Sequence, residues 1–223
     1  MKRVLVVSVH PDDETLGCGG TLLKHQNAGD EIVWLIITNV KEEYGYSHAR
    51  VISRNLEIDA VSKEYNFRKV INLEFQPTRL NSENQHDLIA KISKVFSEIH
   101  PEIIYLINRS DAHSDHRFAF SACYACTKAF RHPYIQKILM YECLSETEFA
   151  AQLPENVFIP NYFVDITDFI DKKIKIMGIY TSEIKEPPFP RSFQNIRALA
   201  SFRGASCGKQ YAEAFQLLKY IVN

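Results

Sequence analysis

The amino-acid sequence predicts an α/β fold in which a mostly parallel sheet lies between two layers of helices. Short apolar runs of strand length alternate with longer segments of helical periodicity, and this alternation is typical of parallel sheets built from right-handed β-α-β units. The chain has 223 residues, of which 46% are hydrophobic and 24% charged, a balance that can bury one sizeable core. We therefore expect a single domain over residues 1–223.

The first strand is expected at residues 4–9, Val-Leu-Val-Val-Ser-Val. A run of this kind is typical of a parallel strand that is buried on both faces. Residues 17–20, Gly-Cys-Gly-Gly, look like a tight turn that leads into a helix ending near residues 28–30. A second apolar run at residues 32–38 predicts the second buried strand.

Two more helix and strand pairs follow. Apolar residues recur at helical spacing over residues 47–65, and residues 69–73 predict a short strand. Residues 85–99 place their apolar side chains on one helical face, and His100-Pro101 ends that helix before an apolar run at residues 103–107. This repeated order predicts that consecutive strands run parallel.

The second half of the chain continues the pattern less regularly. We expect a helix at residues 117–130, a strand at residues 135–141 and an edge strand at residues 162–166. A further helix is expected at residues 168–180, and the tail at residues 209–220 looks like a docking helix. No repeat, low-complexity tract or linker interrupts this order.

Composition excludes several classes of partner. A formal net charge of -1 and a pI near 6.7 give no basic field for nucleic acid or an anionic membrane surface. No stretch approaches the roughly 20 apolar residues that span a bilayer, and the first ten residues lead into an acidic turn without a cleavage-like site. Five cysteines, an odd number, suit reduced thiols. We therefore expect a cytoplasmic protein with no membrane and no nucleic-acid partner.

Two polar clusters follow two of the expected strands. His10-Pro11-Asp12-Asp13-Glu14 comes directly after residues 4–9, and His113-Ser114-Asp115-His116 comes shortly after residues 103–107. Ligands of open α/β sheets bind at the carboxyl ends of the strands. The sequence therefore predicts that both clusters face one crevice.

The residue types in these clusters favour a catalytic metal. Zinc used for catalysis takes three nitrogen or oxygen side chains and keeps a position for water, whose pKa falls toward 7. His10, Asp13 and His116 make such a set, because a turn can aim the i,i+3 pair at one ion while the second loop closes the site. Asp12 is then left beside the metal as a candidate general base, and His113 is placed to stabilise an oxyanion or to protonate a leaving amine. Asp115 would orient one of the histidines through a hydrogen bond.

Together the clusters resemble the two signatures of the PIG-L/LmbE-like zinc N-deacetylases. That family includes the deacetylases of N-acetylglucosaminyl-phosphatidylinositol and of the mycothiol and bacillithiol precursors. Further segments resemble family segments in the same order along nearly the whole chain: residues 17–21, 54–57, 141–142, 203–204 and 211–215.

The resemblance implies a Rossmann-like three-layer sandwich and a role for each matched residue. By it, His10, Asp13 and His116 are the zinc ligands, Asp12 is the general base and His113 is the acid or oxyanion-stabilising group. Arg54 resembles the family arginine that reaches substrate hydroxyls. The implied reaction removes the acetyl group from an N-acetylated amino sugar or its conjugate, by attack of zinc-activated water with a protonated His113 stabilising the oxyanion. Relatives often form homo-oligomers, which the sequence also allows.

Two departures from the family pattern affect the substrate. Many relatives carry Asn-Asp-Arg-His-Pro-Asp-His where residues 109–116 read Arg-Ser-Asp-Ala-His-Ser-Asp-His, so the arginine and proline of that loop are missing. The membrane segment of the eukaryotic glycolipid enzyme is also absent, which argues against that substrate. A small-molecule N-acetylated sugar is therefore the expected partner.

Other interpretations of the same residues stay open. Two histidines and one carboxylate are also the ligand set of iron-dependent oxygenases, and such a site can take Fe²⁺, Co²⁺ or Mn²⁺ as well as zinc. A non-catalytic sugar-binding protein is a further alternative. Cys123 and Cys126 form a Cys-x-x-Cys pair whose spacing within a helix marks a buried face. The stretch Pro187-Pro188-Phe189-Pro190-Arg191 cannot form regular helix or central strand, and it could border the mouth of the site.

Overall fold

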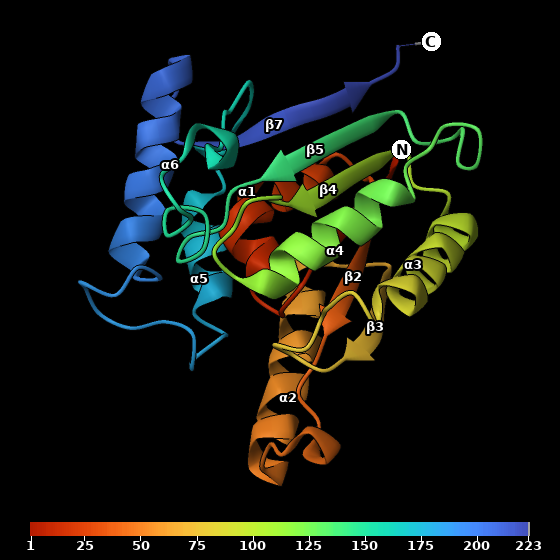
Figure 1. Cartoon of the computed structure of the whole chain (residues 1–223). Coiled ribbons are helices and arrows are strands. Elements are labelled where there is room, and N and C mark those ends of the chain that lie inside the picture. Colours follow the sequence, from red (N-terminus) through yellow and green to blue (C-terminus); the bar gives the residue numbers. More distant parts are fainter. Residues whose placement is uncertain (223) are drawn as a thin grey trace.

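The computed structural model describes residues 1–222, so Asn223, the last residue of the expected domain, lies outside the described residues. Within them the chain forms a seven-stranded sheet in the order β3-β2-β1-β4-β5-β7-β6 (Figure 1). The strands are β1 (Arg3–Ser8), β2 (Glu31–Thr38), β3 (Lys69–Phe75), β4 (Ile103–Ile107), β5 (Lys137–Tyr141), β6 (Tyr162–Asp165) and β7 (Ala212–Tyr220). Only β7 runs against its neighbours. The predicted α/β fold with a mostly parallel sheet is confirmed.

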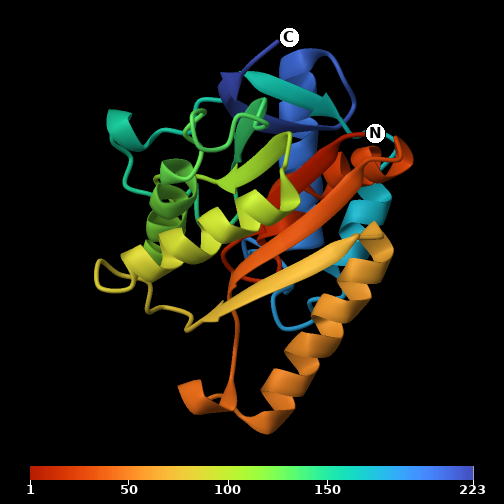
Figure 2. The same ribbon diagram turned by 90° about the vertical axis from the view of Figure 1, so that its right-hand side faces the viewer.

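Helices cover both faces of this sheet. They are α1 (Asp13–Asn27), α2 (His48–Tyr65), α3 (Gln85–Ile99), α4 (Ser114–Ala125), α5 (Ile170–Met177) and α6 (Phe193–Cys207), with short 3-10 helices at Glu42–Tyr44 and Pro154–Asn156. Helices α3 and α4 pack together on one face, whereas α1, α5 and α6 pack on the other, and Figure 2 shows α2 on the α1 side. None of these helices is both long and apolar enough to cross a membrane.

The central strands are buried because both faces are covered. All five residues of β4 are buried, as are the residues of β1 from Val4 onward. This two-sided burial explains why the strands are continuous apolar runs rather than alternating ones. Strands β1 and β4 are neighbours in the sheet, and the chain continues from β1 toward β2 on one side and from β4 toward β5 on the other. Because these two connections leave the carboxyl ends of the strands in opposite directions, a crevice opens between them at that edge.

The glycine-rich segment at residues 17–20 is not the expected turn. Helix α1 begins earlier, at Asp13, and passes through the segment with a kink at Cys18, whose φ of -142° and ψ of 21° are not helical. The carboxylate of Glu213 on β7 accepts hydrogen bonds from the backbone N–H groups of Gly20 and Thr21, at 2.8 and 2.7 Å. A Cβ atom on Gly17 would lie 2.0 Å from the Tyr141 ring. The glycines therefore serve close packing, and a distant carboxylate supplies the acceptor that the kink requires.

The tail expected as a docking helix is strand β7. Residues Ala212–Tyr220 pair antiparallel with β5 on one side and β6 on the other. The preceding helix α6, at Phe193–Cys207, was not expected. Its boundaries follow ordinary rules, since the Ser192 side chain accepts a hydrogen bond from the Asn195 N–H and Gly208 ends the helix at a φ of 72°.

Helix α4 also begins earlier than expected, at Ser114 rather than residue 117. His113 is its N-cap residue, and the imidazole Nδ1 accepts a hydrogen bond from the Asp115 N–H at 3.1 Å. The second polar cluster is therefore the first turn of a helix, which fixes the directions of its side chains.

Candidate active site

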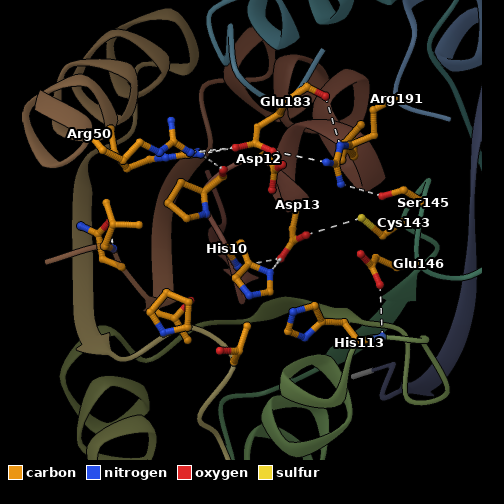
Figure 3. Close-up of a pocket in the computed structure, with 18 of the residues that line it drawn as sticks. His10, Asp12, Asp13, Arg50, His113, Cys143, Ser145, Glu146, Glu183 and Arg191 are labelled. Atoms are coloured by element: carbon orange, nitrogen blue, oxygen red, sulfur yellow. Dashed lines mark hydrogen bonds and ion pairs between the residues drawn. The ribbon is translucent and has the colours of Figure 1, made fainter. Parts of the chain in front are cut away.

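A cavity of about 270 Å³ opens at the carboxyl edge of the sheet, and both polar clusters line it (Figure 3). The loop after β1 supplies His10, Asp12 and Asp13, and the start of α4 supplies His113. His116 lies behind them, fully buried. The structure thus brings together the residues expected to bind a metal and those expected to act as acid and base.

His10, Asp13 and His116 present three ligand atoms to one point. His116 Nε2 lies 3.3 Å from His10 Nδ1 and 3.6 Å from Asp13 Oδ2, and the His10 Nδ1 to Asp13 Oδ2 distance is 4.0 Å. Two ligand atoms at tetrahedral positions around one zinc ion lie about 3.4 Å apart. The spacing and the donor types therefore fit a divalent metal with an open coordination position.

Backbone donors hold Asp13 in place as a carboxylate. Its Oδ2 accepts hydrogen bonds from the N–H groups of Val9 and His10, at 2.9 and 2.8 Å. Burial alone would raise the pKa of Asp13, but His116, His10 and the two backbone donors lower it overall. The negative form is the one that a metal requires.

Asp111, which lies outside both polar clusters, orients His116. Its Oδ2 lies 2.9 Å from His116 Nδ1, so that Nδ1 carries a proton and Nε2 faces the site. Burial opposes protonation of His116, yet Asp13 and Asp111 raise its pKa to about 9. Asp115, expected to orient a histidine, lies 3.6 Å from His10 Nε2 and accepts hydrogen bonds from the N–H groups of Thr78 and Leu80.

Asp12 lies beside the metal-ligand set in an uncommon backbone conformation. Its φ is 144°, a region that non-glycine residues rarely adopt, and its side chain is buried. Burial, with the nearby charges of Asp13 and Glu183, holds the pKa of Asp12 well above its usual value, although Arg191 and Arg54 oppose the shift. Unusual backbone geometry and a raised pKa are both typical of functional carboxylates.

Glu14 is the hydrogen-bond centre that supports this loop. It is fully buried, and its two oxygens accept four hydrogen bonds, from Ser8 Oγ, the Asp12 N–H, Thr15 Oγ1 and Tyr180 Oη, at 3.0, 3.2, 2.7 and 2.8 Å. Glu14 belongs to the first polar cluster, but its residue type and spacing indicate no role for it. Its partner Tyr180 is 166 positions away, which no local pattern could indicate.

His113 lines the cavity beside the other two histidines. Its ring centroid lies 4.6 Å from that of His10 and 5.4 Å from that of His116. Burial, then the positive charges of the neighbouring histidines, lower the pKa of His113 to about 4, which favours the neutral ring at neutral pH. Because Nδ1 accepts from the Asp115 N–H, the neutral ring carries its proton on Nε2. It can donate a hydrogen bond without being charged.

Three arginines and Glu183 close the other side of the cavity. Arg54 lines it, but its side chain is almost fully buried, with Nη1 donating to the Pro11 carbonyl at 2.6 Å and Nη2 paired with Glu183. Arg50 pairs with the same carboxylate at 3.0 Å. Arg191 Nη1 donates to Ser145 Oγ at 2.7 Å, and its Nη2 lies 3.3 Å from Glu183 Oε2. Of the stretch at residues 187–191, Arg191 thus lines the site and the four residues before it do not, whereas Glu183 and Arg50 gave no sequence signal.

Comparisons with known proteins agree on the family. The family model described as GlcNAc-PI de-N-acetylase (PIG-L) matches residues 5–127. The diacetylchitobiose deacetylase of Thermococcus kodakarensis is 24% identical over 227 residues, covering 98% of this chain and 84% of the relative. A conserved protein of Thermus thermophilus superposes with a TM-score of 0.78 at 24% identity, over 100% of this chain and 97% of the other.

One structural neighbour carries out a different reaction. The 4-carboxy-2-hydroxymuconate hydratase GalB of Pseudomonas putida superposes with a TM-score of 0.75 at 18% identity, over 100% of this chain and 98% of the other. Likeness at this level shows the fold alone. The reaction must therefore be argued from the side chains of the site.

Proposed function

Because this chain belongs to the PIG-L family of de-N-acetylases, we propose that it is a zinc-dependent hydrolase that removes the acetyl group from an N-acetylated amino sugar or its conjugate. The observation that supports the proposal best is the position of Asp12. It lies buried beside three converging ligand atoms without belonging to them, and its pKa is raised by burial. A binding or storage site has no need of such a carboxylate.

His10, Asp13 and His116 would hold the metal. When bound there, zinc polarises a carbonyl oxygen and lowers the pKa of a water molecule. Asp12 would take the proton from the attacking water, and a base with a raised pKa suits that task near neutral pH. The same carboxyl group would then give the proton to the departing amine. Acetate and a free amino sugar are the products.

His113 would stabilise the carbonyl oxygen as it becomes negative. Its neutral ring carries the proton on Nε2, because Nδ1 is occupied by the Asp115 N–H. A donor fixed in this way costs little reorganisation during the reaction. A pKa lowered to about 4 supports this neutral role over the protonated one expected from the resemblance.

The cavity favours one sugar unit as its occupant. At about 270 Å³ it is slightly smaller than typical small-molecule pockets of roughly 300–1,000 Å³. Arg54, Arg191 and Glu183 would bind the sugar hydroxyls, since fixed ionic groups favour polar ligands. The relative that acts on diacetylchitobiose supports a chitobiose-like substrate. Five free cysteines support a reducing cytoplasm as the location, and homo-oligomers remain compatible with the chain.

The test is acetate release from N-acetylglucosamine, N,N'-diacetylchitobiose and N-acetylglucosaminyl conjugates by purified protein of measured metal content. Asp12→Asn should lower kcat by at least about a hundredfold, whereas Asp59→Asn, at an exposed position on α2, should leave it unchanged. Full turnover by Asp12→Asn would refute the mechanism. No acetate from metal-loaded protein with any substrate would refute the deacetylase, and oxygen-dependent turnover would then favour the iron oxygenase.

A further inference from the structure

A second cavity lies at the opposite edge of the sheet from the candidate active site. Its volume is about 630 Å³, and it is lined by residues at the amino ends of β1, β4 and β5, by the second half of α1 and by β6. The amino ends of β1 and β4 lie beside the label N in Figure 1. We call it the amino-edge cavity. Nothing in the proposed deacetylation uses it.

Cationic side chains outnumber anionic ones around the amino-edge cavity. Four lysines line it against two aspartates, in a chain whose net charge is -1. The lysines are Lys2, Lys24, Lys137 and Lys209, and the aspartates are Asp30 and Asp165. The cavity is therefore a local positive region on a nearly neutral protein.

Both aspartates are already engaged by other groups. Asp30 accepts hydrogen bonds from the Lys2 backbone N–H and from His25 Nδ1, each at 2.7 Å. Asp165 accepts from the Thr167 hydroxyl and N–H and lies 3.5 Å from the Lys209 ammonium group. These contacts lower the pKa of Asp165 and, against burial, that of Asp30. Neither carboxylate neutralises the remaining lysines.

In the part of the chain that the structure describes, the positive charges of Lys2 and Lys137 are not compensated by a carboxylate. Within residues 1–222 neither side chain forms an ion pair with a carboxylate. Lys137 Nζ lies 3.3 Å from Tyr162 Oη and 5.1 Å from the centre of the Tyr162 ring, so an aromatic wall adjoins the charge. Both lysines line the same cavity as His25, whose pKa is lowered by burial and then by the positive charges of Lys137 and Lys2.

The floor of the cavity is rigid but not suited to acid-base chemistry. Asp30, His25 and Tyr105 form a hydrogen-bonded chain, with 2.7 Å from Asp30 Oδ2 to His25 Nδ1 and 2.8 Å from His25 Nε2 to Tyr105 Oη. Burial lowers the pKa of His25 and raises that of Tyr105, so the ring is neutral and Tyr105 donates to it. These hydrogen bonds thus pair the polar atoms of His25 and the hydroxyl group of Tyr105 within the protein. The hydrogen-bonded chain shapes a binding site, and none of its three side chains is left as a free base.

One buried hydroxyl at this cavity lacks a partner. Thr21 lines it, and its Oγ1 is buried without a hydrogen bond among the described residues. An unsatisfied buried hydroxyl costs free energy in a protein that binds nothing there. A ligand oxygen could supply the missing partner after a rotation of the side chain.

We propose that the amino-edge cavity binds a small organic anion, with its phosphate or carboxylate group between Lys2 and Lys137 and an aromatic or apolar part against Tyr162. The uncompensated lysines select the charge, and the ring beside Lys137 selects the flat apolar part. A neutral compound of the same shape gains only the contact with the Tyr162 ring. Inorganic phosphate gains only the contact with the two lysines.

The test titrates ¹⁵N-labelled protein with phenyl phosphate, benzoate, inorganic phosphate and phenol, and follows backbone amide shifts. Phenyl phosphate or benzoate should bind saturably and shift amides around residues 21–30 and 162–165. A lower Kd for phenyl phosphate identifies a phosphate ligand, and a lower Kd for benzoate a carboxylate. Saturable binding by neither anion, or shifts confined to the loops of the 270 Å³ cavity, overturns the proposal.

Matched variants separate charge from shape. Lys137→Met and Lys2→Met should each weaken the tighter anion about tenfold or more and change phenol binding less than twofold, whereas Lys172→Met, at an exposed position on α5, should change neither. Thr21→Val should weaken the anion while it raises the Tm of the free protein. Equal Kd values for Lys137→Met, Lys2→Met and Lys172→Met would overturn the proposal, as would a Thr21→Val variant that binds like the wild type.

Discussion

Replacement of Glu14 by glutamine tests whether the network behind the metal loop stabilises the fold. The carboxylate is fully buried and accepts four hydrogen bonds. Glutamine keeps the shape but replaces one acceptor oxygen by an NH2 donor. Whichever way the amide is turned, that donor faces two groups that also donate, either Ser8 Oγ and the Asp12 N–H or the hydroxyls of Thr15 and Tyr180.

The expected loss follows from these contacts. A hydrogen bond to a charged group contributes about 1.5–3 kcal/mol, and two of the four are lost or reversed. Relief of the buried charge, whose pKa is raised by burial, offsets part of this cost. The net change should be about 2 kcal/mol of unfolding free energy. For a chain of this length it corresponds to a fall in Tm of about 4–8 °C.

Urea unfolding and thermal scans of Glu14→Gln measure this change, with Glu155→Gln at an exposed site as the control, expected within about 0.5 kcal/mol of the wild type. Glu14→Ala removes the acceptor of the Asp12 N–H altogether. Asp12 should then leave its φ of 144°, and kcat should fall about a hundredfold while KM stays nearly constant. A Glu14→Gln variant as stable as the control would refute the reasoning.

Three further changes test other parts of the structure. Arg191→Met removes a positive charge that lowers the pKa of Asp12, so the acidic side of the pH profile of kcat/KM should move to higher pH. An acidic side that stays in place or moves to lower pH contradicts the assignment of Asp12 as the general base. Asp111→Asn alters the partner of His116 Nδ1 and should weaken metal binding about 10- to 100-fold in a chelator competition; unchanged affinity contradicts it. Glu213→Ala leaves two backbone N–H groups without an acceptor and the buried Lys173 without its carboxylate partner, and it should cost about 3–5 kcal/mol in urea unfolding. A loss below about 1 kcal/mol would show that the kink does not need this carboxylate.

The fold and the central residues of the site could be predicted because their signals are local. Strands β1 and β4 are continuous apolar runs, and the polar cluster after each of them lies within a few residues of the strand end. Parallel pairing then brings His10 and His116 together although 106 positions separate them.

The parts that could not be predicted depend on distant contacts. Strand β7 contains Ala, Glu, Gln and Leu, which favour a helix by intrinsic propensity. It is a strand because β5 and β6 offer hydrogen-bond ladders on both sides. Glu183 contacts Arg54 across 129 positions, and no pattern of residue spacing predicts a partner so far along the chain.

The contact between Glu213 and the kink of α1 has a consequence for the order in which the protein is made. Domains begin to fold while the ribosome is still adding residues. Helix α1 emerges well before β7, since the carboxylate that accepts its Gly20 and Thr21 N–H groups lies 193 and 192 positions later. The Gly20 and Thr21 N–H groups therefore have no access to this acceptor until β7 has been synthesised, and the part of α1 that follows the kink should gain its final hydrogen bonds only after that point.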